Sequence, residues 1–391
     1  MHAAPNLVTV ALVQIFVARI ALLGVMRRVS AILVALAPSL PTIPSALSTS
    51  ALPSMATVAL PRISAERKLS IAYLALPRVL CTDPSDIPDG VYTHINFAFA
   101  SIDPKTFQII PASSKDPQLY RELARKKKID PNLKIFIAIG GWAFNDPGPT
   151  ITTFSDIARS DANTRTFIKS LISFISTYDF DGVDIDWEYP AADDREGREE
   201  DFDNLPKFLS KIKSALKQSG GRSGLSIAIP ASYWYLQHFD LEKISKYVDH
   251  FNVMTYDLHG AWDTPKSWLG NHLNSHTNLT EIKDAFDLLW RNNIDPDQVN
   301  MGLAFYARTF TASSTGCMST GCLFDAGGPA EPCTNAVGVM SNPEIMRKLG
   351  GKIGSGDLDK TAAIKTVKIG STWLTYDDVD TWKLKLDFAR S

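Results

Sequence analysis

The chain has 391 residues, a formal net charge of −2, and 45% hydrophobic and 21% charged residues. This composition is typical of a globular protein with one large domain plus extra segments. The near-neutral charge argues against a nucleic-acid-binding protein, which would normally present a basic surface. The one basic run, residues 125–128, is interpreted as the solvated end of a helix.

The first 65 residues contain no Asp or Glu. A secretory signal would place its cations before the apolar core, whereas here they lie inside and after it. A membrane anchor would carry Arg19 near its middle, where a charge is costly. A mitochondrial-type presequence and an artefact of the gene model remain as further interpretations. Residues 1–67 show no pattern that matches the domain that follows, and we expect them to be disordered or artefactual. We expect no stable membrane partner.

From residue 68 to 391 the sequence alternates short apolar runs with amphipathic stretches, and we expect this range to form the folded domain. Strands are predicted at residues 70–76, 91–99, 134–140, 180–188, 225–230, 248–256 and 299–306. Helices are predicted at residues 164–178, 202–217, 279–290 and 380–389. This alternation predicts an α/β fold with a parallel sheet, either doubly wound or closed into a barrel. No Gly-x-Gly-x-x-Gly opens a helix after the first strand, and polar residues gather at strand carboxyl ends, as in barrel enzymes.

Acidic residues alternate along the predicted strand at 180–188. Asp184, Asp186 and Glu188 share one face of that strand, spaced by about 7 Å. Three carboxylates stacked inside a barrel repel one another unless they share protons or bind a cation. A solvated edge strand and a Mg²⁺ or Ca²⁺ site are the alternatives. We favour proton sharing without a metal, in which Asp186 passes a proton between Asp184 and Glu188 and keeps Glu188 available as a general acid.

The pattern Asp181-x-x-Asp184-x-Asp186-x-Glu188 resembles the signature of family 18 glycoside hydrolases. Trp187, Tyr189 and Pro190 match the chitinases of that family, as do segments 137–142, 254–257 and 305–308. Segments 92–100 and 231–237 resemble fungal killer-toxin-type chitinases. The resemblance extends from about Cys81 to Ser391 and implies a TIM (β/α)8 barrel.

The resemblance also implies an activity. The expected enzyme hydrolyses β-1,4 linkages in N-acetylglucosamine polymers with retention, because the substrate's N-acetyl carbonyl attacks C1 while Glu188 acts as acid and then base. Asp186 would bind the acetamido N–H, and Tyr256 the acetamido oxygen. No cofactor is expected. The expected protein is an extracellular monomer, endo-acting on chitin or chito-oligosaccharides.

Further site residues follow from the resemblance alone. The expected substrate-binding residues are Trp142, Tyr189, Met254, Asp257, Trp234 and Arg308, and Asp181 and Gly182 belong to the structural motif. For Tyr256 the competing interpretation is a core aromatic. For Trp142 and Trp234 it is simple packing at a strand end.

The ends of the domain depart from the family pattern. The segment at 70–76 lacks the aromatic, acidic and Trp-containing character of the family's first strand. Residues 380–389 are the expected seventh helix, capped by Asp380, and the chain stops two residues later. We therefore expect an incomplete barrel of about seven strands, poorly stable and poorly active because strand edges are exposed.

An insertion is expected at about residues 311–375, after the seventh strand. It holds three cysteines, and the sequence does not fix how they pair with each other or with Cys81; zinc is not favoured. The cysteines are Cys317, Cys322 and Cys333. Asn278-Leu279-Thr280 is a glycosylation sequon that matters only in a secreted protein.

Two other functions compete with chitin hydrolysis. A chitin-binding lectin would use the same barrel without turnover, but such proteins usually lose the glutamate that is present here as Glu188. An enzyme that releases N-linked glycans would share the carboxylate motif. The Trp-Glu-Tyr-Pro run at 187–190 and the aromatic strand ends favour chitin.

Overall fold

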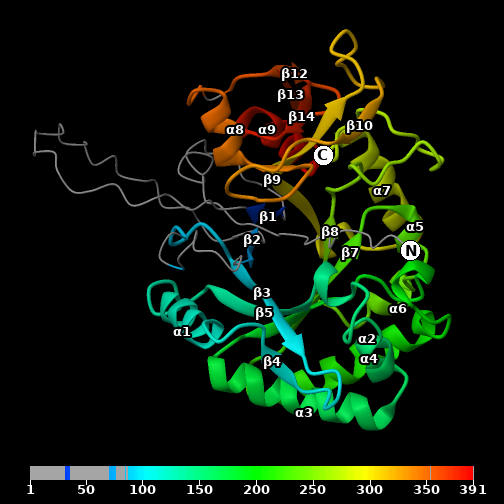
Figure 1. The fold of residues 1–391 in the computed structure, drawn as a ribbon. Helices are drawn as coiled ribbons and strands as arrows, with labels where there is room; N and C mark the ends of the chain where they lie inside the picture. The colour runs from blue at the N-terminus through cyan, green and yellow to red at the C-terminus, as the bar shows by residue number, and fades with distance from the viewer. Residues whose placement is uncertain (1–30, 36–69, 76–83, 85–86, 353, 391) are drawn as a thin grey trace, which may run out of the picture.

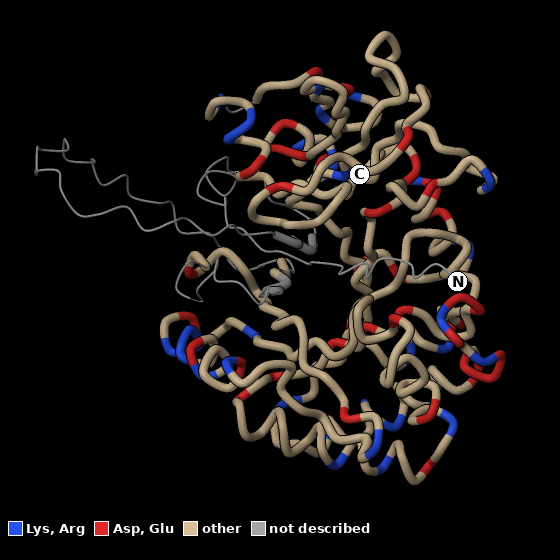
Figure 2. Tube along the Cα trace, in the orientation of Figure 1, with Lys and Arg blue, Asp and Glu red and all other residues tan. Residues whose placement is uncertain are grey.

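The computed structural model describes residues 31–35, 70–75, 84, 87–352 and 354–390 (Figure 1). Among these residues no helix combines the length and apolar character needed to cross a membrane. Acidic and basic positions are interspersed along the trace rather than collected on one side (Figure 2).

Seven parallel strands form the barrel sheet, in the order β2-β3-β5-β6-β7-β8-β9. The strands are β2 (Ser70–Ala75), β3 (His94–Ile102), β5 (Lys134–Gly140), β6 (Gly182–Asp186), β7 (Gly224–Pro230), β8 (His250–Met254) and β9 (Val299–Ala312). Each corresponds to one of the predicted strands, and the α/β-barrel prediction is confirmed. A short strand β4 (Ile109–Pro111) pairs antiparallel with β3.

Helices cover the outside of this sheet (Figure 1). The long ones are α1 (Asp116–Lys126), α3 (Asp161–Tyr178), α4 (Asp201–Leu216), α7 (Leu279–Arg291) and α9 (Val379–Phe388); shorter ones are α2 (Thr153–Ala158), α5 (Tyr233–Leu236) and α6 (Leu241–Ile244). Phe167, Leu171 and Ile175 recur at helical spacing on α3 and are fully buried, which explains why this face packs on the barrel. The four predicted helices are all present, but the cap of the last one is Asp378 rather than Asp380.

A further strand, β1 (Ala31–Ala35), lies beside both ends of this order. It pairs in parallel with β2, where Leu33 is opposite Ala72, and with β9, where Leu33 is opposite Leu303. The expectation that β2 and β9 both lack a partner is therefore wrong over these registers. The rest of the segment 1–67, which we expected to be disordered or artefactual, lies outside the described residues.

The insertion is an antiparallel sheet built on the second half of β9. It contains β10 (Phe324–Gly327), β11 (Val339–Ser341), β12 (Asp357–Asp359), β13 (Ile364–Ile369) and β14 (Thr372–Tyr376), with α8 (Asn342–Lys348) beside β11. Phe310 and Trp373 form part of its buried core. Within the described residues no parallel strand follows β9, as expected for an incomplete barrel. A disulfide joins Cys317 and Cys322; Cys81 lies outside the described residues.

The basic run at residues 125–128 is a solvated helix end only in part, because Arg125 and Lys128 are exposed but Lys126 and Lys127 have acidic partners. The Nζ of Lys126 is buried and donates to the carbonyl of Ile87 at 2.6 Å and to Asp89 at 2.9 Å. Lys127 forms ion pairs with Asp179 and Asp181. These two lysines thus link the end of α1 to the segments that precede β3 and β6, and their charges stabilise the local structure.

Candidate active site

The three predicted carboxylates lie on and just after β6 and are all buried. Asp184, Asp186 and Glu188 are 0%, 4% and 7% exposed. Val183 and Ile185, on the opposite face of the strand, are also fully buried, as expected for a parallel strand covered by helices. Burial on both faces leaves the carboxyl groups dependent on protons and on their neighbours for stabilisation.

Asp184 is held by side chains from the neighbouring strands. Its Oδ1 accepts hydrogen bonds from the Ser226 hydroxyl and from Asn252 Nδ2, the latter at 2.9 Å. The Asn252 carbonyl oxygen accepts in turn from Asn300 Nδ2 at 2.9 Å. Register explains the arrangement, because Ser226 is opposite Asp184 in the β6–β7 pair and Asn300 is opposite Asn252 in the β8–β9 pair. This network fixes the inner end of the carboxylate row.

Asp186 is the carboxyl group in the middle of the row. Burial raises its pKa well above the usual range, and the nearby Glu188 and Asp184 raise the pKa further. Asp186 therefore holds a proton more tightly than an exposed aspartate does. Its Oδ1 is buried and has no hydrogen-bond partner among the described residues. A buried, unpaired carboxyl oxygen is costly unless a ligand completes it.

Glu188 lies at the outer end of the row. Burial raises the pKa of its carboxyl group to about 7, although a hydrogen bond from the Tyr189 hydroxyl and the charge of Arg195 both lower it. Its backbone is held from two sides, since its N–H donates to Asn145 Oδ1 at 3.1 Å and its carbonyl accepts from Arg195 Nε at 3.1 Å. A pKa of about 7 suits a group that must first donate and then accept a proton.

Two glycines at the end of β5 allow the backbone to approach β6. Gly140 has a φ of 114°, and a Cβ there would lie 2.0 Å from the carbonyl oxygen of Asp186. Gly141, with a φ of 85°, donates its N–H to that same carbonyl at 2.8 Å. A side chain at Gly140 would push the Asp186 backbone out of place, and one at Gly141 would meet the Phe99 ring at 2.9 Å.

Tyr256 and Asp257 follow β8 at the same end of the barrel. Burial raises the pKa of the Tyr256 hydroxyl well above 10.0, and the charges of Asp186 and Asp257 add to this effect. A Cβ on Gly302 would lie 2.7 Å from Tyr256 Cε1, so glycine leaves room for the ring. Asp257 has a left-handed φ of 59°.

The Asp257 carboxylate is fully engaged by neighbours on β9. Arg308 donates to both of its oxygens, at 2.8 and 2.6 Å, and the Tyr306 hydroxyl donates at 2.7 Å. Burial alone would raise its pKa, but Arg308 and the hydrogen bond from His276 outweigh this effect and hold the pKa well below the usual range. Asp257 is therefore ionised near neutral pH.

Aromatic side chains surround the outer carboxyl group. Tyr189 is buried and stacks on Tyr235 with ring centroids 4.2 Å apart, and it meets the edge of Trp142 at 6.5 Å. Met254 is half-buried at the end of β8. Trp234, on α5, is 63% exposed and makes no ring contact with the other described aromatics of the site. Trp142 and Tyr189 are thus brought together, whereas Trp234 is not.

The motif residues Asp181 and Gly182 lie at the inner start of β6. The Asp181 carboxylate accepts from the N–H of Ile135 at 2.8 Å and from Lys127 at 3.2 Å. A Cβ on Gly182 would lie 2.4 Å from the carbonyl oxygen of Gly224. Both residues therefore join β6 to neighbouring elements rather than lining the site.

Several residues that complete the site were not among those predicted. Ser226 and Asn300 could have been found, because each is a polar residue at an inward position of an otherwise apolar strand. Arg195 and Tyr235 gave no such signal, since they lie outside the strands and reach the site only through tertiary contacts.

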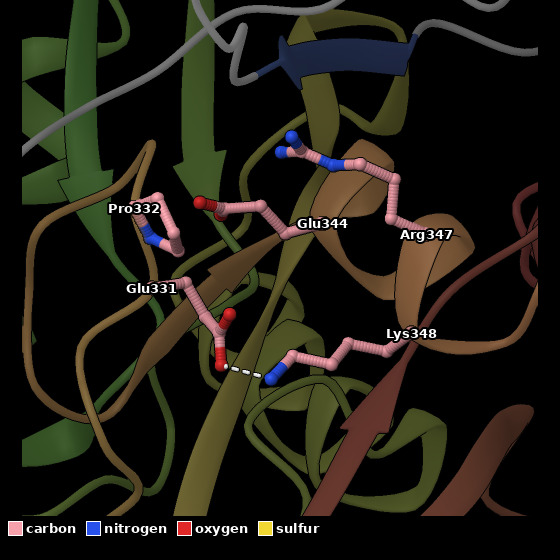
Figure 3. A pocket seen from close by; sticks show the side chains of 5 residues that line it. All are labelled: Glu331, Pro332, Glu344, Arg347 and Lys348. Atoms are coloured by element: carbon pink, nitrogen blue, oxygen red, sulfur yellow. Dashed lines mark ion pairs between the residues drawn. The ribbon is translucent and has the colours of Figure 1, made fainter.

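A separate cavity of about 250 Å³ lies in the insertion, lined by Glu331, Pro332, Glu344, Arg347 and Lys348 (Figure 3). Lys348 pairs with Glu331 at 2.8 Å. Glu344 accepts from the N–H groups of Cys333 and Thr334. The two carboxylates that line this cavity thus have local partners, and none of the predicted site residues lines it. No cluster of three or more His, Cys, Asp or Glu side chains able to hold a metal occurs in the described part of the chain.

Comparison with known proteins agrees with this geometry. The glycosyl hydrolases family 18 profile matches residues 78–391. The killer toxin alpha/beta subunits of Kluyveromyces lactis are 36% identical over 272 residues, covering 68% of this chain and 22% of that protein. The probable chitinase LysM11 of Penicillium expansum is 32% identical over 337 residues, covering 79% and 29%.

The solved structure of a Group IV chitinase from Ostrinia furnacalis superimposes with a TM-score of 0.72 at 25% identity, covering 83% of this chain and 90% of that one. The chain spans less than a third of the length of the two curated relatives above. Because the family match covers most of the sequence, the chain belongs to family 18 of the glycosyl hydrolases.

Proposed function

We propose that this glycosyl hydrolase is a chitinase that cleaves β-1,4 linkages of N-acetylglucosamine polymers with retention, using Glu188 as the catalytic acid and base. The observation that carries the proposal is the buried row Asp184–Asp186–Glu188, in which the pKa of Asp186 is raised well above its usual range and the pKa of Glu188 is raised to about 7. Relatives described as chitinases, among them one crystallised with allosamidin, support the substrate class.

In the first step the acetamido carbonyl oxygen of the bound sugar forms a bond to C1 as the bond from C1 to the leaving oxygen breaks. The proton of Glu188 moves to that leaving oxygen, and the sugar becomes an oxazolinium ion. Water then attacks C1, returns its proton to Glu188 and reopens the ring. Two inversions at C1 give net retention.

The other residues act on the acetamido group. Asp186 Oδ1, which is buried without a described partner, is suited to accept the acetamido N–H and to offset the positive charge of the intermediate. The Tyr256 hydroxyl, whose raised pKa keeps it protonated, is suited to donate to the acetamido oxygen. Asp257 and Arg308 would shape the adjacent wall. Trp142, Tyr189, Met254 and Trp234 would contact neighbouring sugars.

The test is the substitution Glu188→Gln, assayed by release of reducing ends from chito-oligosaccharides and by calorimetric binding of the same oligomers. Loss of the general acid should lower turnover by roughly 10²–10⁴-fold or more with binding largely kept. Glu199→Gln is the matched control, because Glu199 is an exposed carboxylate in the loop that follows Glu188. Activity within tenfold of the parent would refute the assignment of Glu188.

The same assay separates the alternatives. Binding of chito-oligosaccharides by the parent without any turnover would indicate a lectin-like protein. Turnover of N-linked glycans with none of chitin oligomers would indicate the glycan-releasing class. An extracellular location forms part of the proposal, and it is supported by the related secreted chitinase LysM12 and by the Cys317–Cys322 disulfide.

A further inference from the structure

Arg195 is a buried cation that the mechanism above does not use. It lies at the end of the short helix η4 (Asp193–Arg195), in the loop that follows the carboxylate strand, and it is only 5% exposed. An arginine in a loop between barrel elements would normally extend into solvent. Burying the guanidinium carries a large desolvation cost, so its contacts must compensate.

The guanidinium of Arg195 joins the two segments that form the outer site. Its Nε donates to the carbonyl of Glu188 at 3.1 Å, and its Nη2 donates to the carbonyl of Trp142 at 3.1 Å. Its Nη1 forms an ion pair with Asp146 at 3.1 Å. All three nitrogens therefore have partners, and two of those partners are backbone atoms of predicted site residues.

The same guanidinium also stacks on the Trp142 indole, with Cζ 3.7 Å from the ring centroid. Arg195 thus fixes Trp142 twice, through its carbonyl and through its ring face. The planar, delocalised guanidinium is suited to make in-plane hydrogen bonds while one face rests on an aromatic ring. Lysine could supply the charge but neither the fork nor the flat face.

We propose that Arg195 is a positioning residue of this site: it locks the Trp142 indole and the Glu188 backbone into one rigid unit that holds the sugar against the proton donor. The proposal rests on the proposed function, because it assumes that Glu188 gives the proton and that Trp142 contacts the substrate. Arg195 itself touches no reacting atom.

A second consequence concerns the charge of Arg195. Burial raises the pKa of Glu188, and the positive charge of Arg195 lowers it, alongside the Tyr189 hydroxyl. Removing the charge should therefore move the pKa of Glu188 upward and displace the basic limb of the pH profile to higher pH. The negative charges of Asp257 and Asp146 act in the opposite direction, and Arg195→Met would leave Asp146 without its ion-pair partner, which adds to the upward movement.

The experiment compares Arg195→Met, Arg195→Lys and the matched control Arg198→Met. Arg198 lies in the same loop and contacts Ser155 and Asp156 rather than the site. We expect Arg195→Met to lower kcat/KM for chito-oligosaccharides by about tenfold or more, with a raised KM. Its basic limb should move up by about half a pH unit or more. Arg195→Lys should restore the basic limb but keep the raised KM, whereas Arg198→Met should keep both parent values.

If Arg195→Met keeps both the KM and the basic limb of the parent, the proposal is overturned. It is also overturned if Arg195→Lys has the KM of the parent. If Arg195→Met does not fold, Arg195→Lys at unchanged Tm decides: a raised KM supports the proposal and a parent KM overturns it.

A measurement without turnover separates this proposal from the proposed function. The Glu188 carboxyl carbon is titrated by NMR in protein labelled with ¹³C-glutamate, and its signal is assigned by its loss in Glu188→Gln. An upward displacement of its midpoint in Arg195→Met supports the role of Arg195 even if the parent cleaves no chitin. An unmoved midpoint, with the indole N–H signal of Trp142 (assigned by its loss in Trp142→Phe) also unchanged, overturns it even if the parent is an active chitinase.

Discussion

Raising the pH should switch off the first chemical step through one group, Glu188. Its pKa is about 7 because burial outweighs the Tyr189 hydrogen bond and the Arg195 charge. Only the protonated form can give a proton to the leaving oxygen. The protonated fraction falls from about one half at pH 7 to about one tenth at pH 8 and about one hundredth at pH 9, so kcat/KM should fall about fivefold from pH 7 to 8 and about tenfold from pH 8 to 9.

The assay is kcat/KM for a chito-oligosaccharide between pH 5 and 9.5, because this parameter reports the ionisation of the free enzyme. An aryl chitobioside serves as the internal control. Its phenolate leaving group departs with little protonation, so its basic limb should be clearly flatter. Samples returned from pH 9.5 to pH 6 must regain activity, which excludes unfolding.

A profile for the oligosaccharide that stays flat or rises between pH 7 and 9 would refute the assignment of the proton to Glu188. Equal limbs for the oligosaccharide and the aryl substrate would contradict the general-acid role in another way, because the ionisation would then govern binding or folding rather than proton donation.

Three further predictions use independent measurements. Tyr256→Phe should lower kcat more than it raises KM, since the hydroxyl would act on the acetamido group as it attacks; an effect confined to KM would contradict this role. Proton NMR of fresh hydrolysate should show the β-anomer first, and substrates without the N-acetyl group should not be cleaved; an initial α-anomer excludes the mechanism. His259 is buried, which lowers its pKa, but bonds to Asp263 at 3.0 Å and Glu281 at 2.8 Å prevail and raise it to about 9. The imidazolium should therefore stabilise the fold fully below pH 6.5 and lose this effect as the pH rises through about 9. The contribution is at most about 3 kcal/mol, less because Glu281 is partly exposed. The Tm difference between parent and His259→Asn should thus be largest near pH 6 and vanish above 9.5, and a pH-independent difference would argue against the imidazolium.

The barrel strands could be predicted because buried parallel strands are short apolar runs between amphipathic helices. Their ends could not. The strand predicted over 180–188 ends at Asp186, since the N–H of Glu188 donates to the Asn145 side chain instead of a neighbouring strand. The strand predicted over 248–256 ends at Met254, and Asp257 beyond it adopts a left-handed backbone. A tertiary contact thus accompanies the first of these strand ends and a left-handed residue follows the second, and the apolar pattern predicts neither.

The candidate site could likewise be predicted only in part. The spacing of Asp184, Asp186 and Glu188 predicts their shared face, because side chains alternate along a strand. The supporting contacts join residues that are distant in the sequence. Asn252 reaches Asp184 from β8, past the intervening β7, and Arg195 joins two separate loops. The residue types alone give no indication of which partner each will meet.

The strand β1 shows why local pattern and global fit must be judged together. The run Ala31–Ala35 is apolar enough for a buried parallel strand, yet it lies within an acid-free segment that gave no reason to assign it to the domain. The predicted weakness of the barrel rested on free edges at β2 and β9, where each buried, unpaired backbone group costs roughly 1–3 kcal/mol. β1 pairs with both edges, from Ala31 opposite Ser70 and opposite Met301 onward, so it removes much of that cost. The stability of the junction between β2 and β9 therefore depends on Ala31–Ala35. These five residues stabilise the fold because they pair with both strands, which their own sequence does not indicate.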